Sequence, residues 1–543
     1  MAERERGFTA RAYALRVNLQ PAPTLYAPAG MVCAVDHLAA QAGLSMLRAG
    51  GSAADAAVAT SAVLAVTSQH ACGMGGDLLA MVAEPGRAPV ALNASGRAGA
   101  GANPERLRDE GHRVMPFRDD IRSVTVPGCV DGWLALHSRF GQLALADVLE
   151  PARHYAEDGF PASPDLAAAC WLVAELPEAA DYFESGPIHP GSLVRRPGVG
   201  RTLAAIASSG RKGFYGGEFG EGLLELGAGE FATGDLERPL ADWSEPLVAE
   251  AFGARLWTVP PNSSGYLTLV SAAIASELDL GSDPADPRFT HLLVEAARQA
   301  AQDRLAVLHE GADVSFLLAP EELCRRRRAI RPDVAAVLGD SYRPGGTIAL
   351  VAVDKNRLGI SMLQSNASGF GAHLIVPGVR IFLHNRGIGF SLEAGHPAEY
   401  GPGRRPPHTL CPTLVTTEDG RLSGVIGTMG GDSQPQILLQ LLARWLVAGE
   451  EPGDVLAAAR WSLRDPDGGS TFDTWRHKGR VQVAIEGHAP ATLAAAIAAL
   501  GHNVVHAPRY SAEFGHAHLI AVNDDGLAGG TDPRPRFGGV AAY

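Results

Sequence analysis

The pattern of apolar and polar positions changes near residue 347. Before that point, apolar residues recur with a helical period over residues 131–180 and 286–310. The nearly continuous apolar run over residues 53–66 predicts a buried helix, and Ser52 with Asp55 forms a capping-box signature at its start. Strand patterns are sparse here, as at 78–82 and 255–259. The first two-thirds of the chain is therefore predicted to be helix-rich.

Short apolar runs of strand length begin at Thr347. The expected strands are 348–353, 358–363, 373–383, 413–417 and 422–426. Asp419-Gly420 between the last two strands is a hairpin signal. Helices are expected at 434–448, 452–459 and 492–499. Strands beside layered helices indicate an α/β sandwich, and the lack of a 20–50-residue repeat excludes solenoids and propellers.

Composition narrows the class of partner. The 543 residues carry 46 Lys and Arg against 59 Asp and Glu, a net charge of −13, which disfavours nucleic acid and anionic membranes. The basic run 325–328 is expected to be a solvated helix face. The six cysteines are scattered singly, and neither a secretory signal nor an 18-residue apolar stretch is present. These features predict a cytoplasmic protein with reduced thiols and no membrane partner.

Two further patterns resemble ligand sites only superficially. His516 and His518 would share one face of a strand, but no third metal ligand is spaced nearby. The glycines of 73–76 lack the lysine of a phosphate-binding loop. We therefore predict neither a metal nor an organic cofactor.

Thr347 carries the most informative chemistry. It follows Gly345 and Gly346 at the start of a buried-looking strand. Its hydroxyl could attack the Gly346 carbonyl, and hydrolysis of the resulting ester would release an α-amino group on Thr347. With a pKa of about 7.7–8.0, that amine could act as the general base for its own hydroxyl. Taken locally, the same three residues are also typical of an ordinary turn into a strand.

A set of ordered motifs favours the first interpretation. They are Gly50-Gly-Ser-Ala-Ala-Asp-Ala-Ala57, Val126-Pro-Gly128, Pro260-Pro-Asn-Ser-Ser-Gly265, Thr347 with Val351-Ala-Val-Asp354, Gln364-Ser-Asn366, Asn385, Pro412-Thr413, Met429-Gly-Gly431 and Gly530-Thr-Asp-Pro-Arg534. With them, the chain resembles the γ-glutamyltransferases (γ-glutamyl transpeptidases) over about residues 28–543. These are N-terminal-nucleophile hydrolases made as one precursor.

The resemblance implies a fold and a processing step. The fold would be a four-layer αββα sandwich of the α/β (α+β) class. Cleavage between Gly346 and Thr347 would leave a helix-rich large subunit, residues 1–346, and a β-rich small subunit, residues 347–543, that starts with the nucleophile. A dimer of such heterodimers is left open. Gly430 and Gly431 match the glycine pair of the family's oxyanion hole, and Asn366 stands where the family has an active-site Asn.

The resemblance also implies candidate substrate-binding residues. Arg97 matches the arginine that holds the substrate's α-carboxylate, although a structural ion pair is an alternative for it. His408 and Thr409 stand where transpeptidases usually carry two serines, and Gln364 belongs to the same motif set. Arg386 and Gly389 replace the transpeptidases' Gln and Asp, of which the Asp pairs with the glutamyl ammonium. A free γ-glutamyl group should therefore bind poorly.

We thus expect an enzyme that transfers a small carboxylate-bearing acyl group from an amide to water through a Thr347 ester. The motif set resembles the branch with oxamate amidohydrolases, cephalosporin acylases and antibiotic-pathway homologues that hydrolyse a carbon–carbon bond. A true γ-glutamyl hydrolase or transpeptidase acting on glutathione-like substrates stays open. So does an unprocessed, non-catalytic binding homologue.

Overall fold

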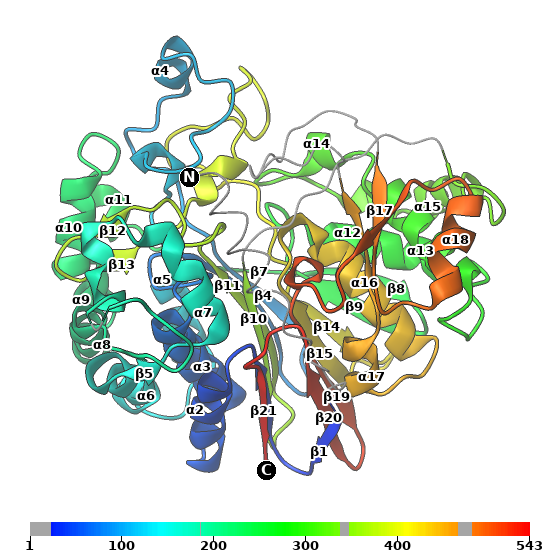
Figure 1. The fold of residues 1–543 in the computed structure, drawn as a ribbon, viewed down its shortest axis with the longest axis horizontal. Helices are drawn as coiled ribbons and strands as arrows, with labels where there is room; N and C mark the ends of the chain where they lie inside the picture. The colour runs from blue at the N-terminus through cyan, green and yellow to red at the C-terminus, as the bar shows by residue number, and fades with distance from the viewer. Residues whose placement is uncertain (1–22, 185, 337–346, 465–480) are drawn as a thin grey trace.

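Two seven-stranded antiparallel sheets lie face to face at the centre of the computed structural model, which describes residues 23–184, 186–336, 347–464 and 481–543 (Figure 1). The first sheet has the order β1 (Leu25–Ala27), β20 (Gly526–Thr531), β19 (Ala517–Asn523), β15 (Leu422–Thr428), β14 (Thr413–Thr416), β9 (Ala254–Thr258), β8 (Leu247–Ala251). The second has the order β21 (Gly539–Ala542), β2 (Met31–Ala34), β10 (Ile348–Val353), β11 (Gly359–Ser365), β3 (Asp77–Ala83), β4 (Val90–Ala94), β7 (Asp242–Ser244).

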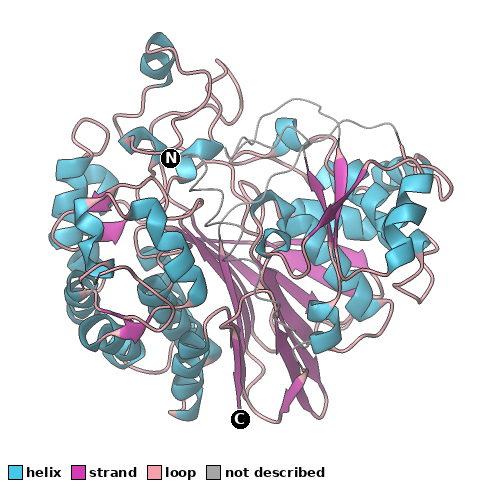
Figure 2. Ribbon diagram, in the orientation of Figure 1, coloured by secondary structure: helices cyan, strands magenta, loops and turns pink. Residues whose placement is uncertain are grey.

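Helices cover the outer face of each sheet (Figure 2). Those beside the second sheet include α2 (His37–Arg48), α3 (Ala53–Thr67), α5 (Cys129–Phe140), α6 (Leu145–Asp158), α8 (Pro197–Ser209), α9 (Arg211–Tyr215) and α10 (Glu218–Leu226). Those beside the first include α12 (Tyr266–Ser276), α13 (Pro287–Ala300), α15 (Pro320–Arg328), α16 (Gln434–Leu446), α17 (Pro452–Ala457) and α18 (Ala491–Ala499).

Three apolar cores separate the four layers. One lies between the second sheet and its helices, one between the two sheets, and one between the first sheet and its helices. The alternation of β10 explains the arrangement, because Ile348 and Leu350 enter the helix-facing core while Ala349 and Val351 face the other sheet. The predicted αββα sandwich is confirmed.

Helix α3 is as buried as its sequence predicts. All of its 15 residues are buried, and the capping box is present, with the Ser52 side chain accepting from the backbone of the first turn and Asp55 accepting from Ser52 N. The expected strands at 348–353, 413–417 and 422–426 are also confirmed, with end shifts of two residues or fewer. The Asp419-Gly420 turn joins β14 to β15.

Three expectations were wrong. The single strand at 373–383 is instead a pair of two-residue strands, β12 (Ile375–Val376) and β13 (Ile381–Phe382), because residues 377–380 turn the chain back. Strands are not sparse before residue 347, since that part supplies three of the seven strands of the first sheet and four of the seven strands of the second. In the basic run, Arg325 and Arg328 are exposed as expected, but Arg326 is buried and pairs with Asp303 and Glu322.

Candidate active site

Thr347 lies at the start of β10, in the space between the two sheets. Its side chain is almost fully buried, and its Oγ1 lies 3.3 Å from Ser365 Oγ. The antiparallel register pairs Ile348 with Gln364, which places Thr347 opposite Ser365, the last residue of β11. The hairpin of β10 and β11 thus brings two hydroxyl groups together at one end of the second sheet.

Arg386 extends this cluster. It begins a short 3-10 helix, Arg386–Gly389, and its guanidinium is fully buried. Its Nη2 donates to Ser365 Oγ at 2.9 Å, its Nη1 to Thr409 Oγ1 at 3.4 Å and its Nε to Asp77 Oδ2 at 2.9 Å. The Arg386 guanidinium is therefore linked to Thr347 Oγ1 through the Ser365 hydroxyl.

Asp77, the first residue of β3, balances that charge. Its carboxylate also has His408 Nε2 at 2.8 Å and His384 Nδ1 at 3.4 Å. Burial alone would raise the pKa of Asp77, but the Arg386 charge and the two imidazoles hold this pKa well below its usual range. Burial, reinforced by Arg386, lowers the pKa of His408 to about 4. At neutral pH, Asp77 is therefore ionised and His408 is a neutral ring.

The Gly430–Gly431 pair comes to the same end of the sandwich from the first sheet. In β15, Gly427 packs on Ala349 and Leu363, so the chain that continues past it runs toward Thr347 and Ser365. Gly430 has φ +140° and Gly431 φ +56°, a left-handed conformation that only glycine adopts without strain. The loop leads directly into α16, whose N-terminus carries a partial positive charge. Backbone N–H groups here suit a developing oxyanion.

Asn366 follows Ser365 and packs on the glycine loop 73–76. Its Nδ2 donates to Gln69 O at 3.0 Å, and its buried Oδ1 has no hydrogen-bond partner among the described residues. The fit is close, because a Cβ at Gly76 would lie 2.8 Å from Asn366 Oδ1. Asn366 therefore holds an unused acceptor against the glycine loop, and its role in catalysis stays a prediction.

Gln364 is not brought to Thr347. It points to the opposite face of the sheet, where Ser61 Oγ of α3 donates to its Oε1 at 2.9 Å and its Nε2 donates to Ser61 O at 3.0 Å. Its alternation with Ser365 along β11 explains this. These contacts give it a structural setting, and its assignment to substrate binding stays a prediction.

Arg97 lies in a separate ionic cluster. Its Nη1 donates to Glu310 Oε1 at 2.7 Å and to Gly403 O at 2.9 Å, and its Nη2 lies 3.5 Å from Asp242 Oδ2. The side chain keeps 13% of its surface exposed. A substrate carboxylate would therefore have to compete with two protein carboxylates for this guanidinium.

Three residues of the cluster were missed by the sequence reasoning. Ser365 lies inside a quoted motif, and pairing β10 with β11 residue by residue would have put it beside Thr347. Asp77 is a charged residue at the head of an otherwise apolar strand, a signal for a buried ion pair. His384, whose Nε2 donates to Thr125 O at 2.9 Å, lies in no sequence pattern that marks it.

Within the described ranges, no group of three or more His, Cys, Asp or Glu side chains is arranged so that it could hold a metal ion. No helix in these ranges is both long and apolar enough to cross a bilayer. His518 Nδ1 instead lies 2.9 Å from Thr531 Oγ1, across the pair of strands β19 and β20. Gly346, the other half of the expected cleavage site, lies outside the described residues.

Known proteins resemble this chain over nearly its full length. The family profile described as Gamma-glutamyltranspeptidase matches residues 39–543. The oxamate amidohydrolase proenzyme of Klebsiella pneumoniae is 34% identical, covering 95% of this chain and 98% of that protein. The glutathione hydrolase-like YwrD proenzyme of Bacillus subtilis is 32% identical, covering 93% and 97%.

A solved structure agrees with the fold. The crystal structure of cephalosporin acylase from Bacillus halodurans superimposes with a TM-score of 0.87 at 32% identity, covering 98% of this chain and 99% of that one. Fold, motifs and length therefore agree across sequence and structure. The chain is a member of the γ-glutamyltranspeptidase family of N-terminal-nucleophile hydrolases, an enzyme of the amidohydrolase and acylase kind whose relatives are made as proenzymes.

Proposed function

We propose that the protein hydrolyses amides of small acyl groups that carry a carboxylate and no ammonium, through an ester on Thr347. The precursor would cut itself between Gly346 and Thr347 into chains of residues 1–346 and 347–543. The observation that carries the substrate class is the charge balance around Thr347, where the described carboxylates are already paired with arginines.

Two carboxylates lie near the hydroxyl pair and the glycine loop. Asp77 is held by Arg386, and Asp432, next to Gly431, accepts from Arg304 Nη2 at 2.6 Å. A γ-glutamyl ammonium would have to break one of these buried pairs, and leaving a buried charge unpaired costs about 3–5 kcal/mol. An acyl group without an ammonium avoids that cost.

Gly389 strengthens the argument. By the resemblance, Gly389 stands at the position where the transpeptidases carry an Asp. A Cβ built on Gly389 would lie 2.7 Å from Pro407 O. The backbone is therefore packed too closely at this position for a carboxylate side chain. Arg386, in contrast, supplies positive charge two hydrogen bonds from Thr347 Oγ1.

The chemistry would run in two steps. The Thr347 amine takes the proton of its own hydroxyl while Oγ1 attacks the substrate carbonyl, and the N–H groups of Gly430 and Gly431 stabilise the oxyanion. The amine then protonates the leaving nitrogen, so the C–N bond breaks and an ester remains. Water, activated by the same amine, attacks the ester and releases the acid. In this proposal, Asn366 Oδ1 accepts a hydrogen bond from the amine.

The relatives support the same class. Oxamate, named for the Klebsiella protein, is an amide whose acyl group carries a carboxylate. We favour cleavage of an amide bond over a carbon–carbon bond, because the names of the Klebsiella protein and of the cephalosporin acylase refer to amide cleavage.

The test is a substrate panel on purified enzyme. Oxamate, glutaryl-p-nitroanilide and γ-glutamyl-p-nitroanilide are compared by kcat/KM, with denaturing intact mass to follow self-cleavage. We expect at least one ammonium-free substrate to exceed the γ-glutamyl substrate by more than about a hundredfold, because the lower end of that cost, about 3 kcal/mol, already corresponds to a ratio of this size. Preference for γ-glutamyl-p-nitroanilide would overturn the proposal.

That outcome would favour a genuine γ-glutamyl hydrolase or transpeptidase, the second candidate, which the glutathione hydrolase-like relative from Bacillus subtilis supports. A third outcome, a chain that stays at full length and turns over nothing, would favour a non-catalytic binding protein.

A further inference from the structure

We propose that Arg460 positions the oxyanion loop, Met429–Gly431, through the neighbouring turn at Gly515 and His516. The inference rests on the proposed function, because it assigns the loop a role in the same reaction. Arg460 touches neither Thr347 nor the loop in any contact described, and it acts as a positioning residue.

Arg460 belongs to a buried ion cluster of two arginines and two carboxylates. Its Nη2 lies 2.5 Å from Asp532 Oδ2, and Asp532 Oδ1 accepts from Arg534 Nη1 at 3.0 Å. Arg534 in turn pairs with Glu486, which accepts from the Arg460 backbone N–H at 2.9 Å. All four side chains are nearly inaccessible to solvent. The cluster is neutral overall, so removing one member leaves an uncompensated buried charge.

The cluster holds the turn from both sides. Arg460 Nη1 donates to Phe514 O at 2.8 Å and lies 3.3 Å from Gly515 O. On the other side, Asp532 Oδ2 accepts from Ala517 N at 3.0 Å. The two residues between these anchors, Gly515 and His516, therefore have little freedom to move.

The turn in turn holds the oxyanion loop. Met429 N donates to His516 O at 3.0 Å. Gly515 has φ +82°, and a Cβ built on it would lie 2.3 Å from Met429 O and 2.8 Å from Thr428 Oγ1. Gly430 is close as well, since its own Cβ would lie 3.7 Å from Gly515 Cα. A shift of the turn would therefore shift the N–H groups that receive the oxyanion.

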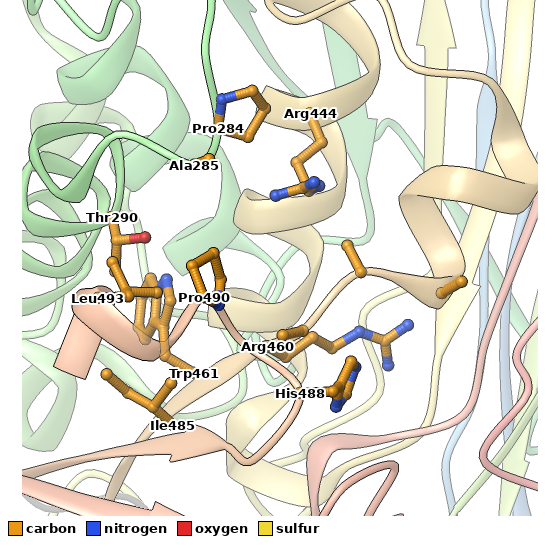
Figure 3. Close-up of a pocket in the computed structure, with 13 residues that line it drawn as sticks. Pro284, Ala285, Thr290, Arg444, Arg460, Trp461, Ile485, His488, Pro490 and Leu493 are labelled. Carbon is orange, nitrogen blue, oxygen red and sulfur yellow. The ribbon is translucent and has the colours of Figure 1, made fainter. Parts of the chain in front are cut away.

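A cavity beside Arg460 leaves room for a methionine at this position. Figure 3 shows the Arg460 side chain along a cavity of about 290 Å³ that Trp461, His488 and Pro490 also line, with the guanidinium directed away from its middle. A methionine can keep the stem in place without overpacking, so Arg460→Met removes mainly the charge and its hydrogen bonds.

The experiment compares Arg460→Met with wild type on whichever panel substrate the wild type hydrolyses. We expect kcat to fall about tenfold to a hundredfold with KM within twofold, because an oxyanion donor acts on the transition state and not on bound substrate. Arg460→Lys, which keeps the charge, should recover part of kcat. Hydrogen exchange by mass spectrometry should show faster exchange of residues 428–431, a readout that needs no substrate.

Arg196→Met is the matched control. Arg196 is equally buried and pairs with Asp181 at 3.1 Å, but it immediately precedes α8 on the outer side of the second sheet. It should lose a similar amount of thermal stability while kcat and the exchange of 428–431 stay at wild-type values. A kcat loss of the same size in both variants would overturn the proposal, because it would reflect stability alone.

Gly515→Ala keeps the inference testable if Arg460→Met does not fold or does not process. It leaves every ion in place but puts a Cβ against Met429 O, and the same selective loss of kcat is expected. Wild-type kcat in Gly515→Ala, or in a folded and processed Arg460→Met, would refute the inference. Failure of the proposed function has a different signature, a wild type that prefers the γ-glutamyl substrate or hydrolyses none.

Discussion

The molecule holds two buried arginine clusters at one end of its sandwich, and they are built differently. Around Asp77, one carboxylate contacts Arg386 and two histidines, and the Nη1 and Nη2 atoms of the same guanidinium donate to the hydroxyls of Thr409 and Ser365. Around Arg460, two arginines meet two carboxylates and bind backbone carbonyls. The first cluster is suited to select a substrate by charge, and the second to hold a loop in place.

The largest effect is expected at Thr347, since both clusters are proposed to serve the reaction at this residue. Thr347→Ala removes the nucleophile, so self-cleavage and turnover should both be lost. Denaturing intact mass should show one full-length chain in place of two, and hydrolysis should fall to the background rate. A cleaved and active alanine variant would refute the assignment of Thr347 and leave neither cluster a role in catalysis.

Matched carboxamide variants separate the two clusters. Asp77→Asn and Asp532→Asn each strip a carboxylate from a buried arginine, so both should lose about 3–5 kcal/mol of folding free energy, measured by denaturant unfolding. Only Asp77→Asn should change KM for charged acyl groups, while Asp532→Asn should lower kcat alone. Identical changes of KM and kcat in the two variants would contradict the assignment of different roles to the two clusters.

Arg97 tests whether substrate charge is also recognised outside these clusters. Its ion pairs with Glu310 and Asp242 make it either a carboxylate clamp or a structural bridge. If it is the clamp, Arg97→Ala should raise KM for carboxylate-bearing substrates about tenfold to a hundredfold, since a charged hydrogen bond contributes about 1.5–3 kcal/mol. An unchanged KM would identify the bridge, and Arg97→Lys shows whether charge alone suffices.

The smallest effect is on acid stability. Burial lowers the pKa of His408 beside the first cluster and of His516 beside the second to about 4 in each case. Unfolded histidine has a pKa near 6.5, so between pH 6.5 and 4 the unfolded chain binds more protons and stability should fall as pH falls. Thermal unfolding across this range should have a shallower slope in His408→Gln. An equal slope would show that His408 does not contribute.

Much of this architecture could be predicted from the sequence, but not its polar interior. The capping box at Ser52, the strand after Thr347 and the Asp419-Gly420 hairpin depend on neighbours in sequence, and all three are present. Asp77 and Arg386 lie more than 300 residues apart, and no local pattern pairs them. The inward direction of Ser365 rather than Gln364 follows only once β10 and β11 are set in register.

The sheet order has a consequence for the proposed cut. Strands from both sides of residue 347 alternate within the second sheet, where β10 is hydrogen-bonded to β2 on one edge and β11 to β3 on the other. A break before Thr347 would therefore nick one continuous fold and not release two independent bodies. The two chains should coelute under native conditions and separate only in denaturant, because parting them means dismantling the sheet that presents the nucleophile.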